Sequence, residues 1–162
     1  MNLMRGGYSW SAPKKNHVLT GTSSLNGYPD IPGERGLIPL EPAEKTVSNR
    51  FLLAGDAAGF VSPFEGEGIF YARRSGEIAA EVISGAISGN NTLASFEEHW
   101  KKEFDFSTLA MLARFLSNDM VLEAFVREIR DNGRFNKLVE DILTKKDKFQ
   151  IKNISSLIKT LV

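Results

Sequence analysis

Apolar residues change their spacing along the chain, and these changes divide the sequence into three parts. Residues 1 to about 50 carry two short runs of β-type residues, Tyr8–Ser11 and His17–Thr22, between glycines and prolines that indicate turns. We expect this first part to form strands joined by irregular loops.

The middle of the chain has the pattern of a strand, a glycine-rich loop and a helix. The short apolar run Arg50–Ala54 ends at a Gly-Asp pair, which suits a buried strand. A loop over Ala57–Gly66 and a helix over Glu67–Ser84 are expected to follow. Gly85 or Gly89 can stop that helix. Its apolar positions recur at helical spacing, and they are Ile69, Ala72, Ile78, Ala79, Val82, Ile83 and Ala86.

The last third of the chain has the spacing of successive helices. Thr92 is a candidate N-cap for a helix that runs towards Phe106, because its hydroxyl can accept a hydrogen bond from a free first-turn amide. A second helix is expected to start at Ser107 or Thr108, and a third at Asp119. The apolar faces of the third, fourth and fifth helices are Val121, Leu122, Phe125, Val126 and Ile129, then Phe135, Leu138, Val139, Ile142 and Leu143, then Ile151, Ile154, Leu157, Ile158 and Leu161.

These patterns predict the α+β fold class with two parts. Residues 1–90 would hold the strands and the strand–loop–helix unit, and residues 91–162 would form a helical C-terminal region. The third helix is expected to end near Asn132–Gly133. The basic run of three lysines over residues 145–148 is expected to be a solvated linker.

Composition narrows the function classes. Twenty basic residues balance 20 acidic ones, so the net charge is zero and a general nucleic-acid binder is not expected. The absence of cysteine excludes a disulfide framework, a thiolate zinc site and a redox dithiol. Met1–Gly7 lack the apolar run of a signal peptide, and no segment approaches the ~18 apolar residues of a membrane-spanning helix. The expected location is the cytoplasm, with contact at a membrane surface left open.

The chemically informative stretch is residues 53–68, with the sequence LAGDAAGFVSPFEGEG. Asp56 follows the expected strand, at the end where open α/β sheets bind ligands, and its carboxylate can accept hydrogen bonds from sugar-type hydroxyls. Gly66 and Gly68 allow close approach of a ligand, and they open the expected helix. The free amides of a helix start favour an anion by ~0.3–1 kcal/mol when exposed. A reduced flavin is negatively charged at one edge of its ring, so such a helix start would favour the reduced state.

This stretch is similar to the second FAD motif of the aromatic hydroxylase and geranylgeranyl reductase flavoproteins. The match is Gly-Asp-Ala-Ala-Gly at residues 55–59, followed by Pro63-x-x-Gly66-x-Gly68. In that superfamily the Asp holds the ribityl chain of FAD, and the Pro and Gly residues sit beside the isoalloxazine ring. The alternative that stays open is a glycine-rich turn between a strand and a core helix. The resemblance implies the cofactor-binding residues Gly55, Asp56, Pro63, Gly66 and Gly68.

A second resemblance narrows the family. The stretch Tyr8-Ser-Trp10-Ser-Ala-Pro13 resembles the Tyr-x-Trp-x-Phe-Pro signature of geranylgeranyl reductases. In that family it lies on the sheet over the flavin and lines the lipid cavity, which implies that Tyr8, Trp10 and Pro13 bind substrate. Ala12 stands where Phe is usual, so the pocket would be wider or differently shaped, and the exact lipid stays open. Taken alone, Tyr-x-Trp on a strand fits core packing equally well. Residues 36–39 resemble the family less specifically.

One expected component is missing from the sequence. A dinucleotide-binding turn of the form Gly-x-Gly-x-x-Gly, with an acidic residue about 20 positions later, does not occur in this chain. Members of the resembled family carry that fingerprint at their own N-terminus. We therefore expect a truncated chain, a fragmentary gene or half of a split protein. Alone it would bind FAD weakly or not at all. If the protein is split, a partner chain would supply the dinucleotide-binding half.

The resemblance implies part of a flavin-dependent oxidoreductase that reduces the double bonds of isoprenoid, geranylgeranyl-type lipids. No catalytic residue, proton donor or electron donor can be named from the sequence. Two alternatives stay open. One is a related FAD monooxygenase or electron-transfer dehydrogenase, and the other is a non-catalytic helical interaction module derived from a flavoprotein.

The remaining candidates have plainer interpretations. His17 and His99 lack metal-ligand spacing, so no metal site is expected. Glu65 and Glu67 flank Gly66 and could tune a flavin or supply a proton, although a solvated loop is the simpler interpretation. Four aromatic residues spaced mainly by four predict the core face of a helix, and they are Phe96, Trp100, Phe104 and Phe106.

Overall fold

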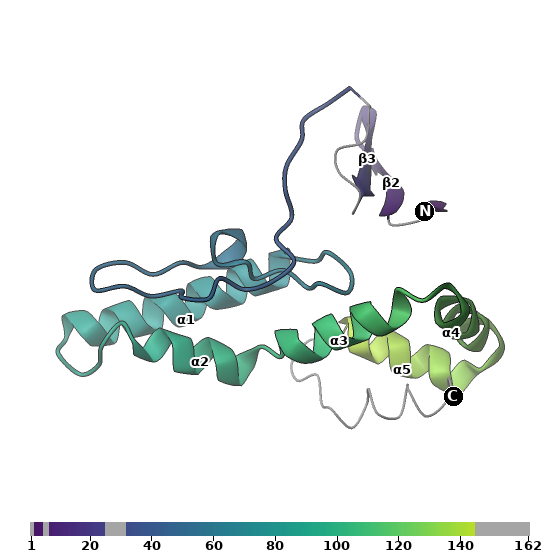
Figure 1. Cartoon of the computed structure of the whole chain (residues 1–162). Helices are drawn as coiled ribbons and strands as arrows, with labels where there is room; N and C mark the ends of the chain where they lie inside the picture. Colours follow the sequence, from purple (N-terminus) through teal and green to yellow (C-terminus); the bar gives the residue numbers. More distant parts are fainter. Residues whose placement is uncertain (1, 5–6, 25–31, 145–162) are drawn as a thin grey trace. The chain divides into compact units, whose positions relative to one another are not determined.

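The computed structural model describes residues 2–4, 7–24 and 32–144 and divides the chain into two units, Met1–Leu37 and Ile38–Val162 (Figure 1). The described residues are of the α+β class, with all strands in the first unit and all helices in the second. The fifth helix expected from the sequence and the three lysines of residues 145–148 lie outside the described residues.

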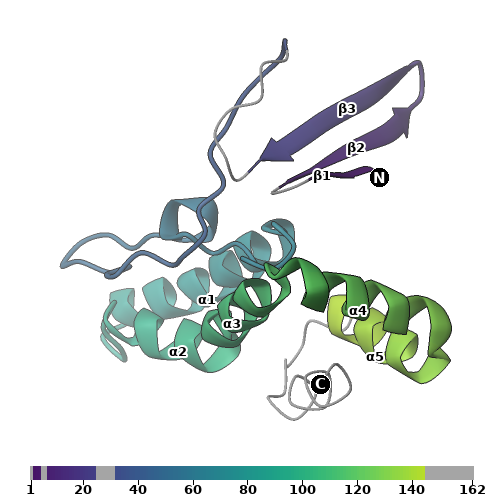
Figure 2. The ribbon, with the colours of Figure 1, turned by 45° about the vertical axis from the view of Figure 1, so that its right-hand side comes forward.

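The first unit is an antiparallel sheet in the order β1-β2-β3 (Figure 2). Its strands are β1 (Asn2–Met4), β2 (Gly7–Lys14) and β3 (His17–Ser24). Both β-type runs of the sequence are confirmed, and β2 and β3 pair along their whole length. Polar residues meet across the pair, as at Ser9 and Thr22, whose hydroxyl oxygens lie 3.0 Å apart.

Up to residue 144, where its described part ends, the second unit contains a short 3₁₀ helix and five α-helices. Figure 2 shows α1 beside α2, and α4 beside α5, and these pairs are in contact. The elements are η1 (Gly55–Ala58), α1 (Ile69–Ile87), α2 (Ser95–Glu103), α3 (Phe106–Leu116), α4 (Asp119–Asp131) and α5 (Gly133–Thr144). Among the helices of the described residues, none is both long and apolar enough to cross a membrane.

The end of α1 is set by Gly89, one of the two glycines expected to stop it. Gly89 has a φ of 74°, and its N–H donates to the Ala86 carbonyl. The Asn90 N–H donates to the carbonyl of Gly85, which lies inside the helix. These two bonds form a Schellman motif, in which a residue with positive φ satisfies the last carbonyls of a helix.

Two helices in the C-terminal half begin at residues other than those expected. Thr92 is not an N-cap: α2 begins at Ser95, whose N–H and hydroxyl both donate to the Thr92 carbonyl. Helix α3 begins at Phe106, because the Asp105 carboxylate accepts a hydrogen bond from the Thr108 N–H at 3.1 Å. The expected start of α4 at Asp119 is confirmed.

The expected buried strand over Arg50–Ala54 is wrong. Within the described residues this segment makes only an isolated β-bridge, between Leu52 and Val47. The two hydrogen bonds beside it join Leu53 N–H to the Thr46 carbonyl and Ser48 N–H to the Phe51 carbonyl. A strand needs a hydrogen-bonded neighbouring strand along its length, and here the pairing segment spans only residues 46–48. The segment is also not buried, since Phe51 is 60% exposed.

The core of the second unit is built around Phe60, which is fully buried at the end of the Gly-Asp loop. Ring centroids of Trp100, Phe104 and Phe106 lie 4.9 to 5.6 Å from that of Phe60. The four aromatic residues expected to form a core face are all buried, but they are not on one helix, because Phe104 follows the end of α2 and Phe106 begins α3. Burial of one such side chain stabilises the fold by about 1.5–3 kcal/mol. A second cluster joins α3, α4 and α5 and contains Leu112, Leu116, Phe125, Phe135 and Val139.

A polar cluster attaches the segment before the loop to α2. The Trp100 indole N–H donates to Thr46 Oγ1 at 3.0 Å. The Glu97 carboxylate accepts a hydrogen bond from the Thr46 N–H at 2.9 Å and pairs with Lys101 at 3.1 Å. The Thr46 N–H first, and then Lys101, lower the pKa of Glu97 below its usual value.

Candidate functional site

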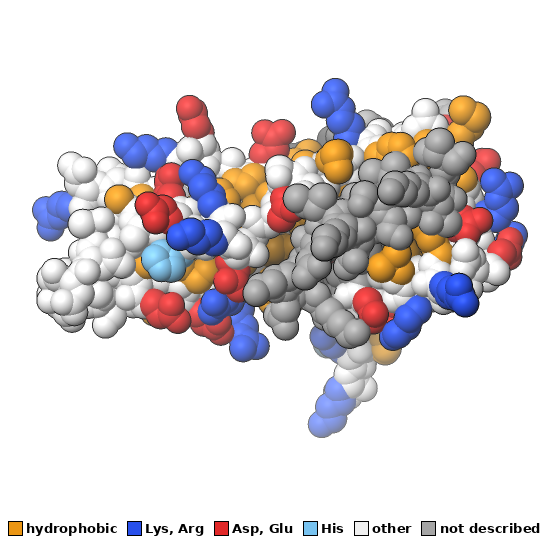
Figure 3. All heavy atoms as spheres, turned by 90° about the horizontal axis from the view of Figure 1, so that it is seen from below, with side chains coloured by type: hydrophobic (Ala, Val, Ile, Leu, Met, Phe, Trp, Pro, Cys, Tyr) orange, Lys and Arg blue, Asp and Glu red, His pale blue; other side chains and the backbone are white. Residues whose placement is uncertain are grey.

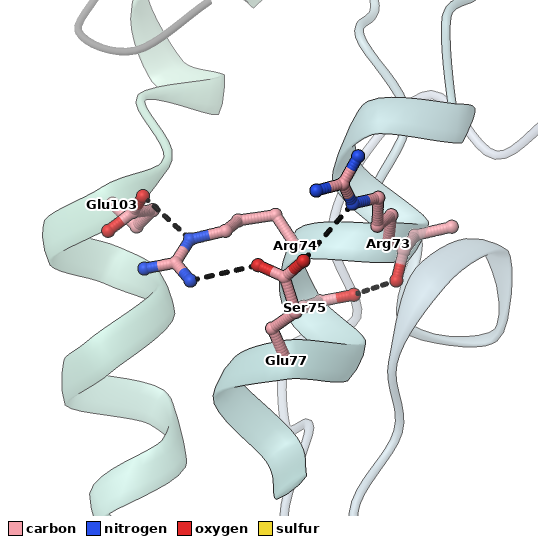
Figure 4. Close-up of polar contacts among 6 residues, drawn as sticks. Arg73, Arg74, Ser75, Glu77 and Glu103 are labelled. Atoms are coloured by element: carbon pink, nitrogen blue, oxygen red, sulfur yellow. Dashed lines mark hydrogen bonds and ion pairs between the residues drawn. The ribbon is translucent and has the colours of Figure 1, made fainter. Parts of the chain in front are cut away.

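The Gly-Asp loop is anchored to α1 through buried hydrogen bonds. The Gly55 N–H donates to Ser75 Oγ at 3.0 Å. The Ser75 hydroxyl in turn donates to the Ala72 carbonyl at 3.1 Å (Figure 4). Ser75 is fully buried. A serine in the second turn of α1 thus fixes the start of the loop.

Two glycines give the loop its shape. Gly55 and Gly59 have φ values of 56° and 72°, which other residues rarely adopt. A Cβ on Gly59 would lie 2.2 Å from the Glu41 carbonyl oxygen, so only glycine fits there. The backbone turns sharply between them, and Phe60 N–H donates to the Gly55 carbonyl at 3.0 Å. The turn directs Phe60 into the core and leaves Asp56 exposed.

The structure brings Asp56 and Gly68 together, although they are twelve positions apart in the sequence. A Cβ on Gly68 would lie 3.1 Å from the Asp56 Oδ1 atom and 3.3 Å from Val61 Cγ2. Gly68 is the N-cap residue of α1. The result is an exposed carboxylate next to a helix start, with a glycine that keeps the space beside it open.

The loop residues between these two are also closely tied. Gly66 has a φ of 71°, and its N–H donates to the Ser62 carbonyl at 2.8 Å. The Ser62 N–H in turn donates to the Glu67 carbonyl at 2.8 Å. Pro63 lies half-buried between them. All five residues that the resemblance assigns to FAD, at positions 55, 56, 63, 66 and 68, therefore lie in one continuous turn that ends at α1.

Glu67 has a role that its sequence position did not indicate. Its Oε1 atom accepts a hydrogen bond from the Phe70 N–H at 2.8 Å, so the carboxylate caps the first turn of α1. Glu65 and Glu67 are both half-buried, which corrects the simpler interpretation of a solvated loop. A helix start of Glu-Gly, without Ser, Thr, Asp or Asn at the cap position, gives little sequence signal for this bond.

Ser62 is a second residue that the sequence interpretation missed. It is fully buried, and its hydroxyl makes no hydrogen bond within the described residues. A serine beside a proline in a loop predicts a solvated turn, so nothing in the sequence indicates this burial. Buried hydroxyls without partners are uncommon and point to a functional or strained position.

Tyr71 lies directly behind the loop, in the first turn of α1. Its ring is buried against Phe104 and Phe106, with centroids 5.3 and 4.9 Å away. Burial, and then the carboxylates of Glu65 and Glu67, raise the pKa of the Tyr71 hydroxyl well above its usual range. The carboxylates of the loop therefore act electrostatically on a hydroxyl group in the core.

The two arginines of α1 are engaged in surface ion pairs (Figure 4). Arg74 contacts Glu103 of α2 at 2.9 Å and Glu77 at 3.1 Å, and Arg73 contacts Glu77 at 3.1 Å. These hydrogen bonds, first that to Glu103, raise the pKa of Arg74. Because the pairs are solvent-exposed, they stabilise the helix contact only modestly. Charged side chains of both signs are interspersed on the face in Figure 3.

The residues expected to bind substrate lie in the first unit, on β2. Trp10 pairs with Gly21 of β3, and a Cβ on Gly21 would lie 2.4 Å from the Trp10 ring. The indole therefore covers the glycine, and it is 38% exposed. Tyr8 pairs with Ser23, and Pro13 pairs with Val18. Because Trp10 and Pro13 are three residues apart on one strand, they lie on opposite faces of the sheet.

The histidines do not form a metal centre in the part of the chain that the structure describes. His17 lies at the start of β3, and His99 is on α2, where its Nδ1 atom lies 2.7 Å from the Ser95 carbonyl. Across the described ranges, no group of three His, Cys, Asp or Glu side chains could hold a metal ion.

Comparison with known proteins finds relatives in several organisms, and the names of these relatives resemble one another. No family model matches the chain, and no solved structure matches it. It is 30% identical over 155 residues to a chloroplastic geranylgeranyl diphosphate reductase of Oryza sativa subsp. japonica, which covers 77% of this chain and 34% of the relative. It is 31% identical over 167 residues to a digeranylgeranylglycerophospholipid reductase of Methanothrix thermoacetophila, which covers 86% of this chain and 40% of the relative.

A cyanobacterial relative agrees with these two. A geranylgeranyl diphosphate reductase of Synechocystis sp. is 31% identical over 156 residues, which cover 76% of this chain and 38% of the relative. The chain spans about a third of the length of the plant relatives it matches. These matches each cover at least three quarters of this chain, and the chain belongs to the geranylgeranyl reductase family.

Proposed function

We propose that this chain supplies one half of the FAD site, and part of the lipid-binding sheet, of a flavin-dependent oxidoreductase. The proposed reaction is reduction of double bonds in isoprenoid lipids, with geranylgeranyl chains as the substrate class. The observation that carries the proposal is the exposed Asp56 carboxylate beside Gly68 at the start of α1. The names of the relatives, which are reductases of geranylgeranyl compounds, support it.

The loop fits FAD on two features of its geometry. The exposed carboxylate of Asp56 can accept hydrogen bonds from the hydroxyls of a ribityl chain. Gly68 leaves room beside that carboxylate which a Cβ would fill, since it would lie within 3.1 Å of Asp56 Oδ1. Gly55, Pro63 and Gly66 would hold the rest of the turn against the cofactor.

FAD, when bound, would supply the hydride chemistry, and the protein's part is to bind, orient and exclude water. Asp56 would fix the position of the ribityl chain, and with it the position of the ring. On β2, Trp10 would offer a broad apolar face to the lipid, and Tyr8, two residues before it, would line the same region. Pro13 lies on the opposite face of the sheet from Trp10, so it is not proposed to line that region. The described residues include no assigned proton donor, and the electron donor is not assigned either.

The proposal needs a second half of the FAD site. The relatives are about three times as long as the segment they share with this chain, and a dinucleotide-binding fold in the same polypeptide or in a partner chain would hold the rest of the cofactor. The proposed location is the cytoplasm, with peripheral membrane contact for lipid loading. Exposed apolar residues such as Leu37, Ile38 and Leu40 would suit such contact.

The test is a single-turnover reaction with the complete protein, meaning this chain together with its dinucleotide-binding half. The bound flavin is reduced without oxygen, a geranylgeranyl lipid is added, and flavin oxidation and lipid saturation are measured. We expect both to occur together, and Asp56→Ala to lose bound FAD. Flavin oxidation only with oxygen, coupled to hydroxylation, would favour a monooxygenase instead. A stable protein complex without any flavin dependence would favour the helical interaction module.

A further inference from the structure

The start of α1 is already partly occupied by the chain's own carboxylate. This helix has 19 residues, and its N-cap, Gly68, has no side chain to satisfy the first amides. Glu67 Oε1 accepts the hydrogen bond from the Phe70 N–H at 2.8 Å. One of the amides that would otherwise face an anion is therefore satisfied, and a negative charge stands in its place.

The surroundings hold that carboxylate in a half-buried position. Glu67 is half-buried, and its carbonyl accepts a hydrogen bond from Ser62 N–H, so both residues belong to one turn. The Ser62 hydroxyl in the same turn is fully buried and makes no hydrogen bond within the described residues, so the turn presents an unused polar group as well. Behind the turn, the pKa of Tyr71 is raised by burial and by the carboxylates of Glu65 and Glu67. A charge that acts on a buried neighbour is screened less than one at the surface.

From this geometry we infer that Glu67 is a positioning residue that makes the bound flavin a stronger reductant. The inference rests on the proposed FAD site. The reduced ring carries negative charge at one edge, and at the start of α1 that edge would meet a carboxylate and one fewer free amide. Like charges in a weakly screened site repel, so Glu67 would disfavour the reduced form relative to the oxidised form.

The direction of this effect suits the proposed substrate class. An isolated isoprenoid double bond has no carbonyl group to accept the developing charge, so its reduction requires a strong electron donor. A helix start with only free amides would act in the opposite direction, because it would stabilise the reduced anion. Glu67 thus limits the stabilisation that the helix end would otherwise give.

The test compares the affinity for oxidised and reduced FAD in the complete protein, by spectroscopic redox titration. Glu67→Gln removes the charge and retains an amide oxygen that can accept the Phe70 N–H bond. We expect Glu67→Gln to favour the reduced form by about two- to fivefold, in line with the size of helix-terminus effects. Glu81→Gln is the matched control, because Glu81 is an exposed glutamate of α1, about four turns beyond Glu67.

The outcomes separate this inference from the proposed function. If the wild-type complete protein holds FAD but Glu67→Gln binds both forms as the wild type does, the inference is overturned and the proposed function stands. An equal shift in Glu81→Gln would also overturn it, because the effect would then be one of net charge. A wild-type protein that holds no FAD overturns both.

The capping bond can be tested in this chain without any cofactor. Hydrogen exchange of the Phe70 amide reports whether Glu67 holds the first turn of α1. We expect Glu67→Ala to speed that exchange several-fold and Glu67→Gln to leave it close to the wild-type rate. Equal rates in all three proteins would overturn the geometric basis of the inference.

Discussion

The sheet of the first unit and the helices of the second differ in how they bury their side chains. Among the described residues of the first unit, none is buried, and Trp10, Val18 and Leu19 are 38 to 60% exposed. The second unit encloses its own core around Phe60, with aromatic rings from α1, α2 and α3. The Gly-Asp loop thus lies on a self-supporting unit, whereas the Tyr-x-Trp motif lies on a sheet without a cover of its own.

The two parts of the proposed site are therefore stabilised in different ways. Isolated sheets of few strands are marginal in water unless one face packs against something else. The loop is fixed by the fold that surrounds it, through Gly55, Gly59 and Ser75. The sheet, by contrast, would acquire a fixed environment only from a lipid, from the missing half of the site or from another part of the protein.

The largest expected loss of stability comes from a substitution in the core of the helical unit. Phe60→Ala removes the central ring of the aromatic cluster and should lower the free energy of unfolding by about 3–5 kcal/mol. Phe51→Ala is the control, because Phe51 is 60% exposed and its loss should change that energy by less than about 0.5 kcal/mol. Urea unfolding followed by helical circular dichroism measures both. Equal losses would show that Phe60 is not the centre of the core.

A smaller effect is expected where the loop backbone is tightest. Gly59→Ala and Gly89→Ala both place a side chain at a φ near +70°, which costs about 1–2 kcal/mol. At Gly59 the new Cβ would also meet the Glu41 carbonyl oxygen at 2.2 Å, whereas at Gly89 it meets open space. Gly59→Ala should therefore be less stable by a further 1–3 kcal/mol or so. Thermal unfolding of the two variants side by side would refute this if their midpoints coincide.

Acid should weaken the attachment of Thr46 to α2. The pKa of Glu97 is lowered in the folded state from its usual 4.5, chiefly by the Thr46 N–H. A lowered pKa contributes stability that is present above the unfolded value and is lost as the pH falls through the folded one. Below about pH 4.5, the wild type should lose stability more steeply than Glu97→Gln. Glu98→Gln, at a highly exposed neighbour, should retain the wild-type slope in urea titrations across pH.

The smallest effect on stability is expected in the sheet. Gly21→Ala places a Cβ 2.4 Å from the Trp10 ring, so the indole must move off β3. Unfolding of the helices should be unchanged, because the sheet and the helices belong to separate units of the chain. Tryptophan emission should shift, and it should not do so in a Trp10→Phe background, in which only the buried Trp100 remains. A shift that persists in that background would place the change in the second unit.

The features that local sequence rules govern were predicted well. Both strands of the hairpin, the start of α4 and the glycine that ends α1 follow from alternation and from turn chemistry. The Gly-Asp loop and the helix after it were also located from their spacing. The family pattern assigned Asp56 and Gly68 to one site, and the structure places them side by side.

The features that failed depend on contacts distant in the sequence. Arg50–Ala54 has the composition of a buried strand, but the described chain gives it a neighbour of only three residues. The bond from Gly55 to Ser75 spans 20 positions, and nothing local to either residue predicts it. The capping role of Glu67 was missed because the N-cap position itself is occupied by Gly68, and a glycine there is a weak sequence signal.

Flavin binding by the Gly-Asp loop is tested most directly by the FAD dissociation constant of the complete protein with and without the Asp56 carboxylate. Asp56→Ala should weaken FAD binding about tenfold or more, as expected for the loss of hydrogen bonds to a charged group. Glu44→Ala, which removes an exposed carboxylate outside the loop, should leave the constant unchanged. If Asp56→Ala binds FAD as tightly as Glu44→Ala does, the Gly-Asp loop is not part of a flavin site, and the central claim is wrong.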